Sequence, residues 1–113
     1  MDKLNQYRRL VMELMQEQAD LMKSQPVPGE EVDCVFDTER DHYLLLRYGW
    51  TRGKFTHYTK LHVRLSDGKI RIEEDMTEEG FATELATSGV DWKDIILAFN
   101  TPLQQTKPEM ASV

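Results

Sequence analysis

The sequence predicts one α+β domain, in which a long N-terminal helix packs on a four-stranded antiparallel sheet that two short helices follow. Three observations predict this class: apolar residues at helical spacing in residues 1–25, strand-like alternation over residues 31–75, and two capped apolar segments within residues 77–101. A chain of 113 residues is long enough for one modest core. Residues 103–113 are mostly polar and are expected to form a flexible tail.

The first segment has the pattern of an amphipathic helix. Its apolar residues recur at steps of three and four, as in Leu4, Tyr7, Val11, Leu14 and Leu21. Asp2 is placed to cap the first turn, and Pro26, Pro28 and Gly29 end the helix. The stripe suits packing on a sheet, but a helix of about 22 residues is ~33 Å long, which exceeds the strands it would cover. Part of the stripe is therefore also a candidate contact with a second subunit.

The strands alternate apolar and polar side chains, as half-buried strands do. The first carries Val32, Cys34 and Phe36 on one face. The second carries Leu44, Leu46, Tyr48 and Trp50 on one face, whereas Leu45 points the other way and indicates cover on both sides. In the third, the alternation assigns one face to Phe55, His57, Thr59, Leu61, Val63 and Leu65. It assigns the other to Lys54, Thr56, Tyr58, Lys60, His62 and Arg64.

The turn Asp67-Gly68 predicts a tight hairpin between the third and fourth strands. Both central residues of such a turn need positive φ, which glycine adopts without steric cost. The resulting register places Leu65 opposite Ile70 and Val63 opposite Ile72, so the apolar pairs share one face. On the other face it places His62 opposite Glu73 and Lys60 near Asp75.

Two short helices are predicted to complete the fold. Thr77 is placed to cap the first of them, and Gly89 to end it in the left-handed conformation. Asp91 is placed to cap the second, which Pro102 ends. Its apolar side would consist of Trp92, Ile95, Ile96 and Phe99.

Composition is that of an ordinary soluble protein, with 40% hydrophobic and 30% charged residues. The chain has one cysteine, Cys34, no basic-then-apolar leader and no apolar run of membrane-spanning length, so a cytoplasmic location is expected.

Charge is distributed unevenly along the chain. Residues 40–72 hold eight basic and two acidic residues, a net charge of +6. Since the whole chain has a net charge of −6, the other residues together carry −12. A basic strand face could contact DNA or an acidic partner, or could simply be solvated. Its candidates are Lys54, Lys60, Arg64 and Arg71.

Residues that could carry catalysis or bind a metal do not form a recognisable pattern. His57 and His62 are an odd number apart on one strand and are expected on opposite faces. The acidic residues concentrate at turns and helix starts, where charge is favourable without catalysis. We therefore predict a protein that is not an enzyme and that needs no cofactor. Trp50 and Arg52 are the candidate partner-binding residues, although a core tryptophan at a sheet edge is the alternative for Trp50.

Four spaced elements of the sequence, taken together, resemble the XisI family. They are Gly49-Trp50, Asp67-Gly68-Lys69-Ile70, Thr77-x-x-Gly80-x-Ala82-x-Glu84-Leu85, and Gly89-Val90-x-x-x-Asp94-Ile95-Ile96-Leu97-x-Phe99. The resemblance implies an accessory excision controlling factor for programmed DNA excision in heterocyst-forming cyanobacteria. It also implies a companion, XisH, which has a nuclease-like fold. Many members follow the final phenylalanine with His-Pro-Pro, whereas this chain has Asn100-Thr101-Pro102, so any contacts of that histidine are lost here.

The sequence is compatible with two functions. The first is a non-catalytic interaction module that binds an XisH-like protein and itself as a dimer; the acidic total and the wide helix stripe favour it. The second is a small DNA-binding excision factor that uses the basic strand face. Such factors are usually basic overall, and this chain is acidic.

Overall fold

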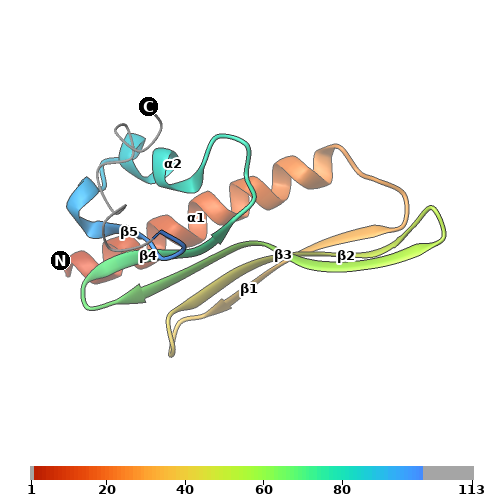
Figure 1. The fold of residues 1–113 in the computed structure, drawn as a ribbon. Helices are drawn as coiled ribbons and strands as arrows, with labels where there is room; N and C mark the ends of the chain where they lie inside the picture. The colour runs from red at the N-terminus through yellow and green to blue at the C-terminus, as the bar shows by residue number, and fades with distance from the viewer. Residues whose placement is uncertain (1, 101–113) are drawn as a thin grey trace.

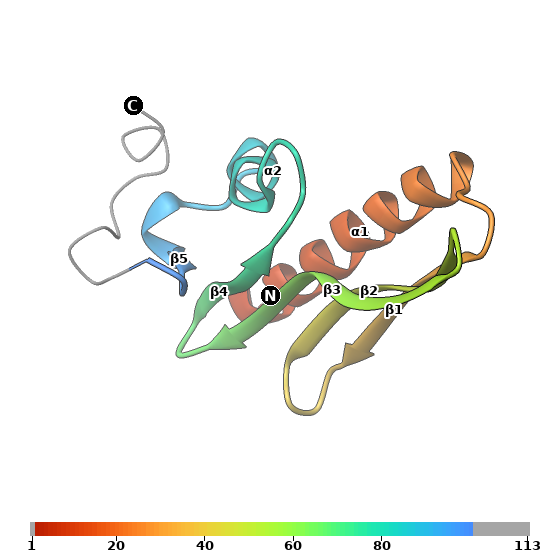
Figure 2. The same ribbon diagram turned by 45° about the vertical axis from the view of Figure 1, so that its right-hand side comes forward.

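A single sheet carries two α-helices on one of its faces (Figure 1). The structure is a computed structural model, and it describes residues 2–100. The elements are α1 (Lys3–Ser24), β1 (Glu30–Asp37), β2 (His42–Thr51), β3 (Lys54–Ser66), β4 (Lys69–Asp75), α2 (Phe81–Thr87), a 3₁₀ turn (Trp92–Asp94) and β5 (Ile95–Leu97). The expected flexible tail and the helix end at Pro102 lie outside the described residues. Both helices lie on the same side of the sheet (Figures 1 and 2).

The sheet has five strands in the order β1-β2-β3-β4-β5, and the β4–β5 pair is parallel. The prediction of four antiparallel strands and a second short helix is therefore wrong at its C-terminal end. Asp91 does cap a turn, because its side chain accepts from the Lys93 amide at 3.0 Å. That turn lasts only three residues, and the β-branched pair Ile95-Ile96 then extends along β4. Extension satisfies the free backbone groups at the edge of β4 and suits β-branched side chains.

The short helix α2 starts at Phe81, three residues later than a cap at Thr77 predicts. Thr77 does not cap it, because its hydroxyl donates to Asp75 at 2.5 Å. Asp75 itself accepts from the Phe81 amide at 2.6 Å and so satisfies the first turn of the helix from the end of β4. Gly80, with φ of +89°, makes the bend between them.

The core lies between α1 and the sheet, as predicted. Asp2 caps α1 by accepting from the Leu4 amide at 3.1 Å. The buried side chains of α1 are Tyr7, Val11, Leu14, Met15 and Ala19. Those of the sheet and of α2 include Tyr43, Leu45, Leu61, Val63, Ile70, Ile72, Phe81 and Leu85. Leu21, near the end of α1, is 59% exposed, so the apolar stripe extends beyond the surface that the sheet covers.

A β-bulge divides the long β2–β3 ladder into two parts. Leu45 pairs with Leu61, but the next residue, Leu46, pairs with Thr59, so Lys60 is an extra residue on β3. Because side chains alternate along a strand, one extra residue exchanges the faces beyond it. The prediction of one common face from Phe55 to Leu65 is therefore wrong. The first half of that set lies on the face opposite the core.

A second irregularity lies between β3 and β4. Val63 pairs with Ile72 as predicted, but His62 pairs with Glu74, which leaves Glu73 as the extra residue. The predicted pairing of His62 with Glu73 is therefore wrong. The hairpin turn itself is as predicted, with positive φ at both Asp67 and Gly68.

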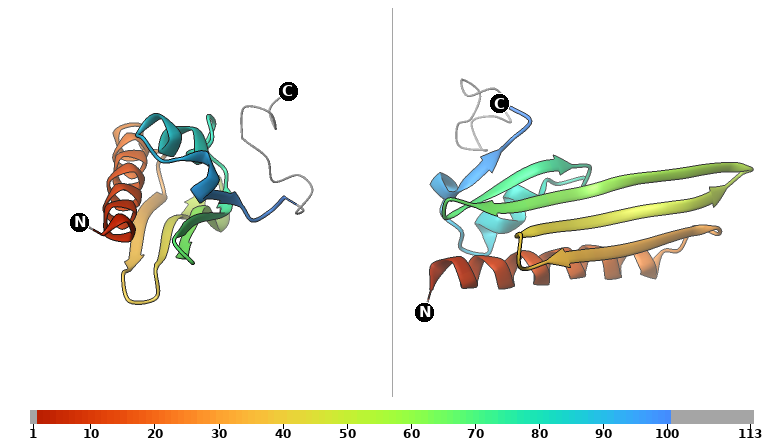
Figure 3. Two further views of the ribbon diagram at one scale, coloured as in Figure 1. Left: turned by 90° about the vertical axis from the view of Figure 1, so that its left-hand side faces the viewer. Right: turned by 90° about the horizontal axis from the view of Figure 1, so that it is seen from below.

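Beyond the bulge, β2 and β3 form an arm, residues 46–59, that projects past the end of α1 (Figures 1 and 3). The base of the arm is still paired with β1, up to Gly49, and only its tip is two-stranded. The arm ends in a second tight turn, with φ of +54° at Arg52 and +75° at Gly53. The sheet surface opposite the helices, here called the open face, carries no helix over β1, β2 and β3 (Figure 3, right).

Candidate interaction surfaces

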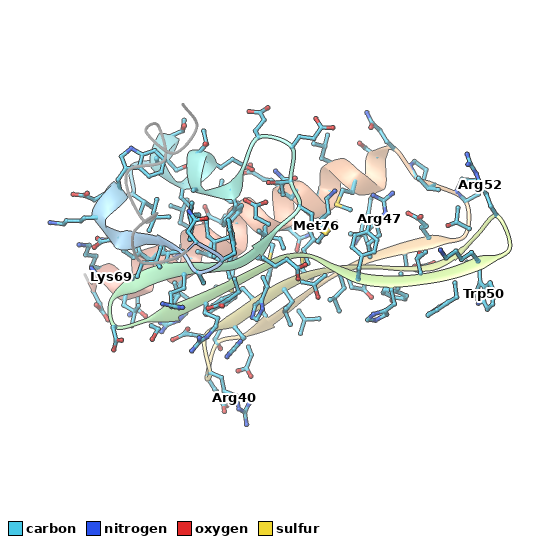
Figure 4. All side chains as sticks on the ribbon, viewed as in Figure 1. Arg40, Arg47, Trp50, Arg52, Lys69 and Met76 are labelled. Carbon is cyan, nitrogen blue, oxygen red and sulfur yellow. The ribbon has the colours of Figure 1, made fainter. Side chains whose placement is uncertain are left out.

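The tip of the arm exposes two aromatic side chains. Trp50 is 63% and Phe55 51% exposed, and their ring centroids are 5.6 Å apart across the ladder. Trp50 is therefore not a core residue, and that alternative is excluded. Arg52 lies in the adjoining turn, but Figure 4 shows it on the opposite side of the hairpin from Trp50. The structure thus places both predicted partner-binding residues at one tip, on different sides of it.

The four basic residues of the predicted strand face do not form one surface. Lys54 is exposed at the tip of the arm, and Lys60, at the bulge, lines a groove on the helix side. Arg64 and Arg71 lie on the open face, where both contact the Glu73 carboxylate, at 3.3 and 3.1 Å. The bulge separates the lysine from the arginines, and the carboxylate offsets the arginine charge.

The groove beside Lys60 has a volume of about 630 Å³ and lies between the second half of α1, the base of the arm and the loop before α2. Its lining residues are Gln18, Leu21, Met22, Gln25, Val27, Arg47, Lys60, Thr77, Glu78, Glu79 and Glu84. Gln18 donates to Glu84 at 2.6 Å, and burial raises the pKa of Glu84 above its ordinary value. Arg47, labelled in Figure 4, forms an ion pair with Glu30. The sequence did not indicate this groove, because three distant segments form it.

Asp94 is the buried carboxylate of the described residues, with 4% of its surface exposed. It lies 2.7 Å from the Lys3 ammonium, accepts from the Tyr7 hydroxyl at 2.5 Å and lies 3.6 Å from the Lys69 ammonium. The Lys3 contact, followed by the Tyr7 hydrogen bond, lowers the pKa of Asp94 below its ordinary value. Since these groups occupy its oxygens, Asp94 is part of the framework that joins α1 to the 3₁₀ turn.

Asp41 has a similar structural role at the β1–β2 turn. It accepts two hydrogen bonds from the Arg8 guanidinium, at 2.8 and 3.0 Å, and one from the Tyr43 hydroxyl at 2.7 Å. The Arg8 contact is the largest cause that lowers the pKa of Asp41. Burial and the same carboxylate raise the pKa of Tyr43 to about 12. This arrangement fixes the turn to α1 and leaves no catalytic base there.

All three histidines lie on the open face, with His57 apart from the pair of His42 and His62. His57 stacks beside Tyr48, with ring centroids 5.7 Å apart, and the His42 Nδ1 lies 3.1 Å from the His62 Nε2. His57 and His62 were expected on opposite faces, and the extra residue Lys60 places them on the same one. Within residues 2–100, no group of three or more His, Cys, Asp or Glu side chains is arranged to hold a metal ion.

Cys34 faces α1 from the edge strand β1, with its Sγ 3.8 Å from the Met15 carbonyl oxygen. Partial burial raises the pKa of this thiol, so it is mostly protonated and weakly nucleophilic at neutral pH.

None of the described helices combines the length and apolar character that a membrane crossing requires.

Comparison with known proteins identifies the family. The family model described as "XisI protein" matches residues 1–112. The crystal structure of a XisI-like protein from Anabaena variabilis ATCC 29413 superposes with a TM-score of 0.83 at 31% identity, over 89% of this chain and 91% of that one. The fdxN element excision controlling factor XisI of the same organism superposes with a TM-score of 0.80 at 34% identity, over 93% of this chain and all of that one. No curated protein matches. The chain belongs to the XisI family.

Proposed function

We propose that this protein is a non-catalytic excision controlling factor that acts by binding an XisH-like protein of nuclease fold. The observation that carries the proposal is the arm, whose tip exposes the paired aromatic side chains of Trp50 and Phe55. Tryptophan and arginine dominate the binding energy of many protein interfaces, and Arg52 lies in the turn at the same tip. Membership of a family that includes a named excision controlling factor supports the regulatory part of the proposal.

Charge supports a protein partner over direct DNA binding. Binding to DNA gains free energy when cationic side chains displace counterions from phosphates. Here the net charge is −6, and Arg64 and Arg71 already contact the Glu73 carboxylate. Lys54 and Lys60 lie apart from them, at the tip and in the groove.

The test is co-purification with a tagged XisH-like protein from the same genome. We expect the wild type to bind and Trp50→Ala to weaken binding by about tenfold or more, as a hot-spot residue does. Phe99→Ala is the matched control, because Phe99 is an aromatic side chain of similar exposure, 58%, on a different element. Equal loss in both variants, or binding that Trp50→Ala leaves unchanged, would refute the role of the arm.

A duplex-DNA titration at rising salt tests the competing function. We expect no binding by the isolated protein at physiological salt. Tight binding with a steep salt dependence, in the absence of any companion, would place the chain among DNA-binding excision factors instead.

A further inference from the structure

The open face of the sheet carries a line of apolar side chains along β2 although no helix covers it. Along β2 its outward side chains are Leu44, Leu46, Tyr48 and Trp50, and Val35 on β1 beside them is 43% exposed. Solvated faces of antiparallel sheets usually carry polar side chains. Contiguous exposed apolar surface commonly marks an interaction site.

The open face is organised in rows that cross β1, β2 and β3. The pairing register gives four of them: Asp37–His42–Arg64, Val35–Leu44–His62, Asp33–Leu46–Thr59 and Glu31–Tyr48–His57. Contacts confirm that neighbouring rows share a face, since the Tyr48 hydroxyl donates to Asp33 of the next row at 2.5 Å and the rings of His42 and His62, from two adjacent rows, lie 5.3 Å apart. Three rows begin with a carboxylate on β1. Three end with a histidine or an arginine on β3.

This pattern is complementary to itself under one symmetry operation. A two-fold axis parallel to β2, above the open face, places a second copy face to face and reverses every row. β2 then lies on β2, and the β1 end of each row lies on the β3 end of the same row. Asp37 meets Arg64, Glu31 meets His57, and the leucines meet in the centre. Such packing keeps the two sheets aligned, the commonest arrangement of stacked sheets.

The alternative axis, perpendicular to the strands, is disfavoured by charge. It would place β1 of one copy antiparallel on β1 of the other, so that the β1 ends of the rows, where Glu31, Asp33 and Asp37 lie, would gather on one side of the interface. Like charges in contact across an interface cost several kcal/mol. We propose that the open face is a homodimer interface whose two-fold axis runs parallel to β2. Both arms then project in the same direction.

The first experiment measures the mass of the full chain in solution by size-exclusion chromatography with light scattering. We expect twice the 13.2 kDa of one chain at micromolar concentration. Leu46→Lys, at the centre of the rows, should give the monomer, whereas Leu21→Lys, the same change at an exposed leucine of α1, should leave the dimer intact. A monomeric wild type, or a dimer that only Leu21→Lys dissociates, would overturn the proposal.

The second experiment tests the direction of the axis. It substitutes two exposed residues, so that the core is not disturbed. His57→Glu should weaken dimerisation by about tenfold, because it sets a carboxylate against Glu31 of the other copy. Adding Glu31→Lys to it should restore the wild-type dissociation constant. Failure of the double variant to recover would exclude the parallel axis. Both measurements use the isolated protein, so their outcome does not depend on the XisH-like partner.

Discussion

The two ends of the β2–β3 ladder differ in how far their side chains are buried, although the strands are continuous. On the body side of the bulge, Tyr43, Leu45, Leu61 and Val63 are fully buried under α1. On the arm side, every described residue from 46 to 59 is at least partly exposed. The backbone hydrogen bonds continue throughout. The difference is therefore one of side-chain burial, which is the larger source of stability.

The contrast teaches how one extra residue separates folding from recognition. Without Lys60, strict alternation would direct Phe55 and His57 to the side of Leu61. The bulge instead turns them to the open face, in line with Trp50 and Tyr48. The body thus retains the apolar residues that stabilise the fold, and the arm presents those available to partners.

The largest effect is expected from truncating the body side. Leu61→Ala removes a fully buried side chain between α1 and the sheet and should lower the free energy of unfolding by about 2–5 kcal/mol. Phe55→Ala on the arm, whose side chain is half exposed, should cost less than about 1 kcal/mol. Urea unfolding followed by circular dichroism measures both. Similar losses would mean that the arm contributes to the core.

A smaller effect is expected where the arm is joined to β1. A β-carbon at Gly49, whose φ is +138°, would lie 2.0 Å from the Gly29 carbonyl oxygen. Gly49→Ala should therefore cost about 2–3 kcal/mol through backbone strain and displacement. Gly53→Ala, at the free tip, meets no atom within 4 Å and should cost about 1 kcal/mol. Thermal unfolding distinguishes the two, and an equal shift in Tm would show that the junction is adaptable.

On the body side, the ion pair between Arg8 and Asp41 should contribute about 1–2 kcal/mol at neutral pH. Arg8→Met should remove it. Because the folded-state pKa of Asp41 is lowered from 3.8, the contribution is present above about that pH and is lost as the pH falls through the folded value. The wild type and the variant should therefore converge below pH ~3.8 in urea titrations. A difference that is constant with pH would exclude the ion pair as its cause.

The smallest effect concerns His62, on the open face beside the bulge. Burial, and then the neighbouring His42, lower the pKa of His62; Glu73 and Glu74 oppose the shift, and Arg64 adds to it. A lowered pKa means that the unfolded chain binds the proton more readily, so stability should fall as the pH drops below about 6.5. His62→Gln should flatten that decline in Tm, measured at one low protein concentration. An unchanged decline would assign it to another group.

Local turn chemistry was predictable because it depends on few neighbouring residues. Asp67-Gly68 forms the expected hairpin turn, with Leu65 opposite Ile70. Gly89 ends α2 with φ of +104°, and the Val90 amide returns to the Leu85 carbonyl oxygen, as in helices that end with a left-handed residue. Each outcome is decided by backbone sterics within a few residues.

The bulge and β5 could not be predicted, because they depend on contacts distant in sequence. In the sequence, Lys60 differs in no way from a lysine in a regular strand, and its extra position is evident only from the pairing of β2 with β3. The apolar spacing around Ile95-Ile96 is compatible with a helix as well as with a strand, and pairing with the free edge of β4 decides for the strand. The candidate site shows the same division: Trp50 was identified from its local context, whereas the groove and the rows of the open face required the observed register.

Asp94 has a consequence for how the protein emerges during synthesis. It lies 87 residues after Tyr7 in the sequence and accepts a hydrogen bond from the Tyr7 hydroxyl. It also forms an ion pair with Lys3 at the start of α1. The first helix made on the ribosome therefore acquires its last polar contacts only after nearly every described residue has been translated. Until then, the apolar stripe of α1 has no complete sheet to cover it. Such a chain completes its fold as a unit, and only after its final strand has left the ribosome.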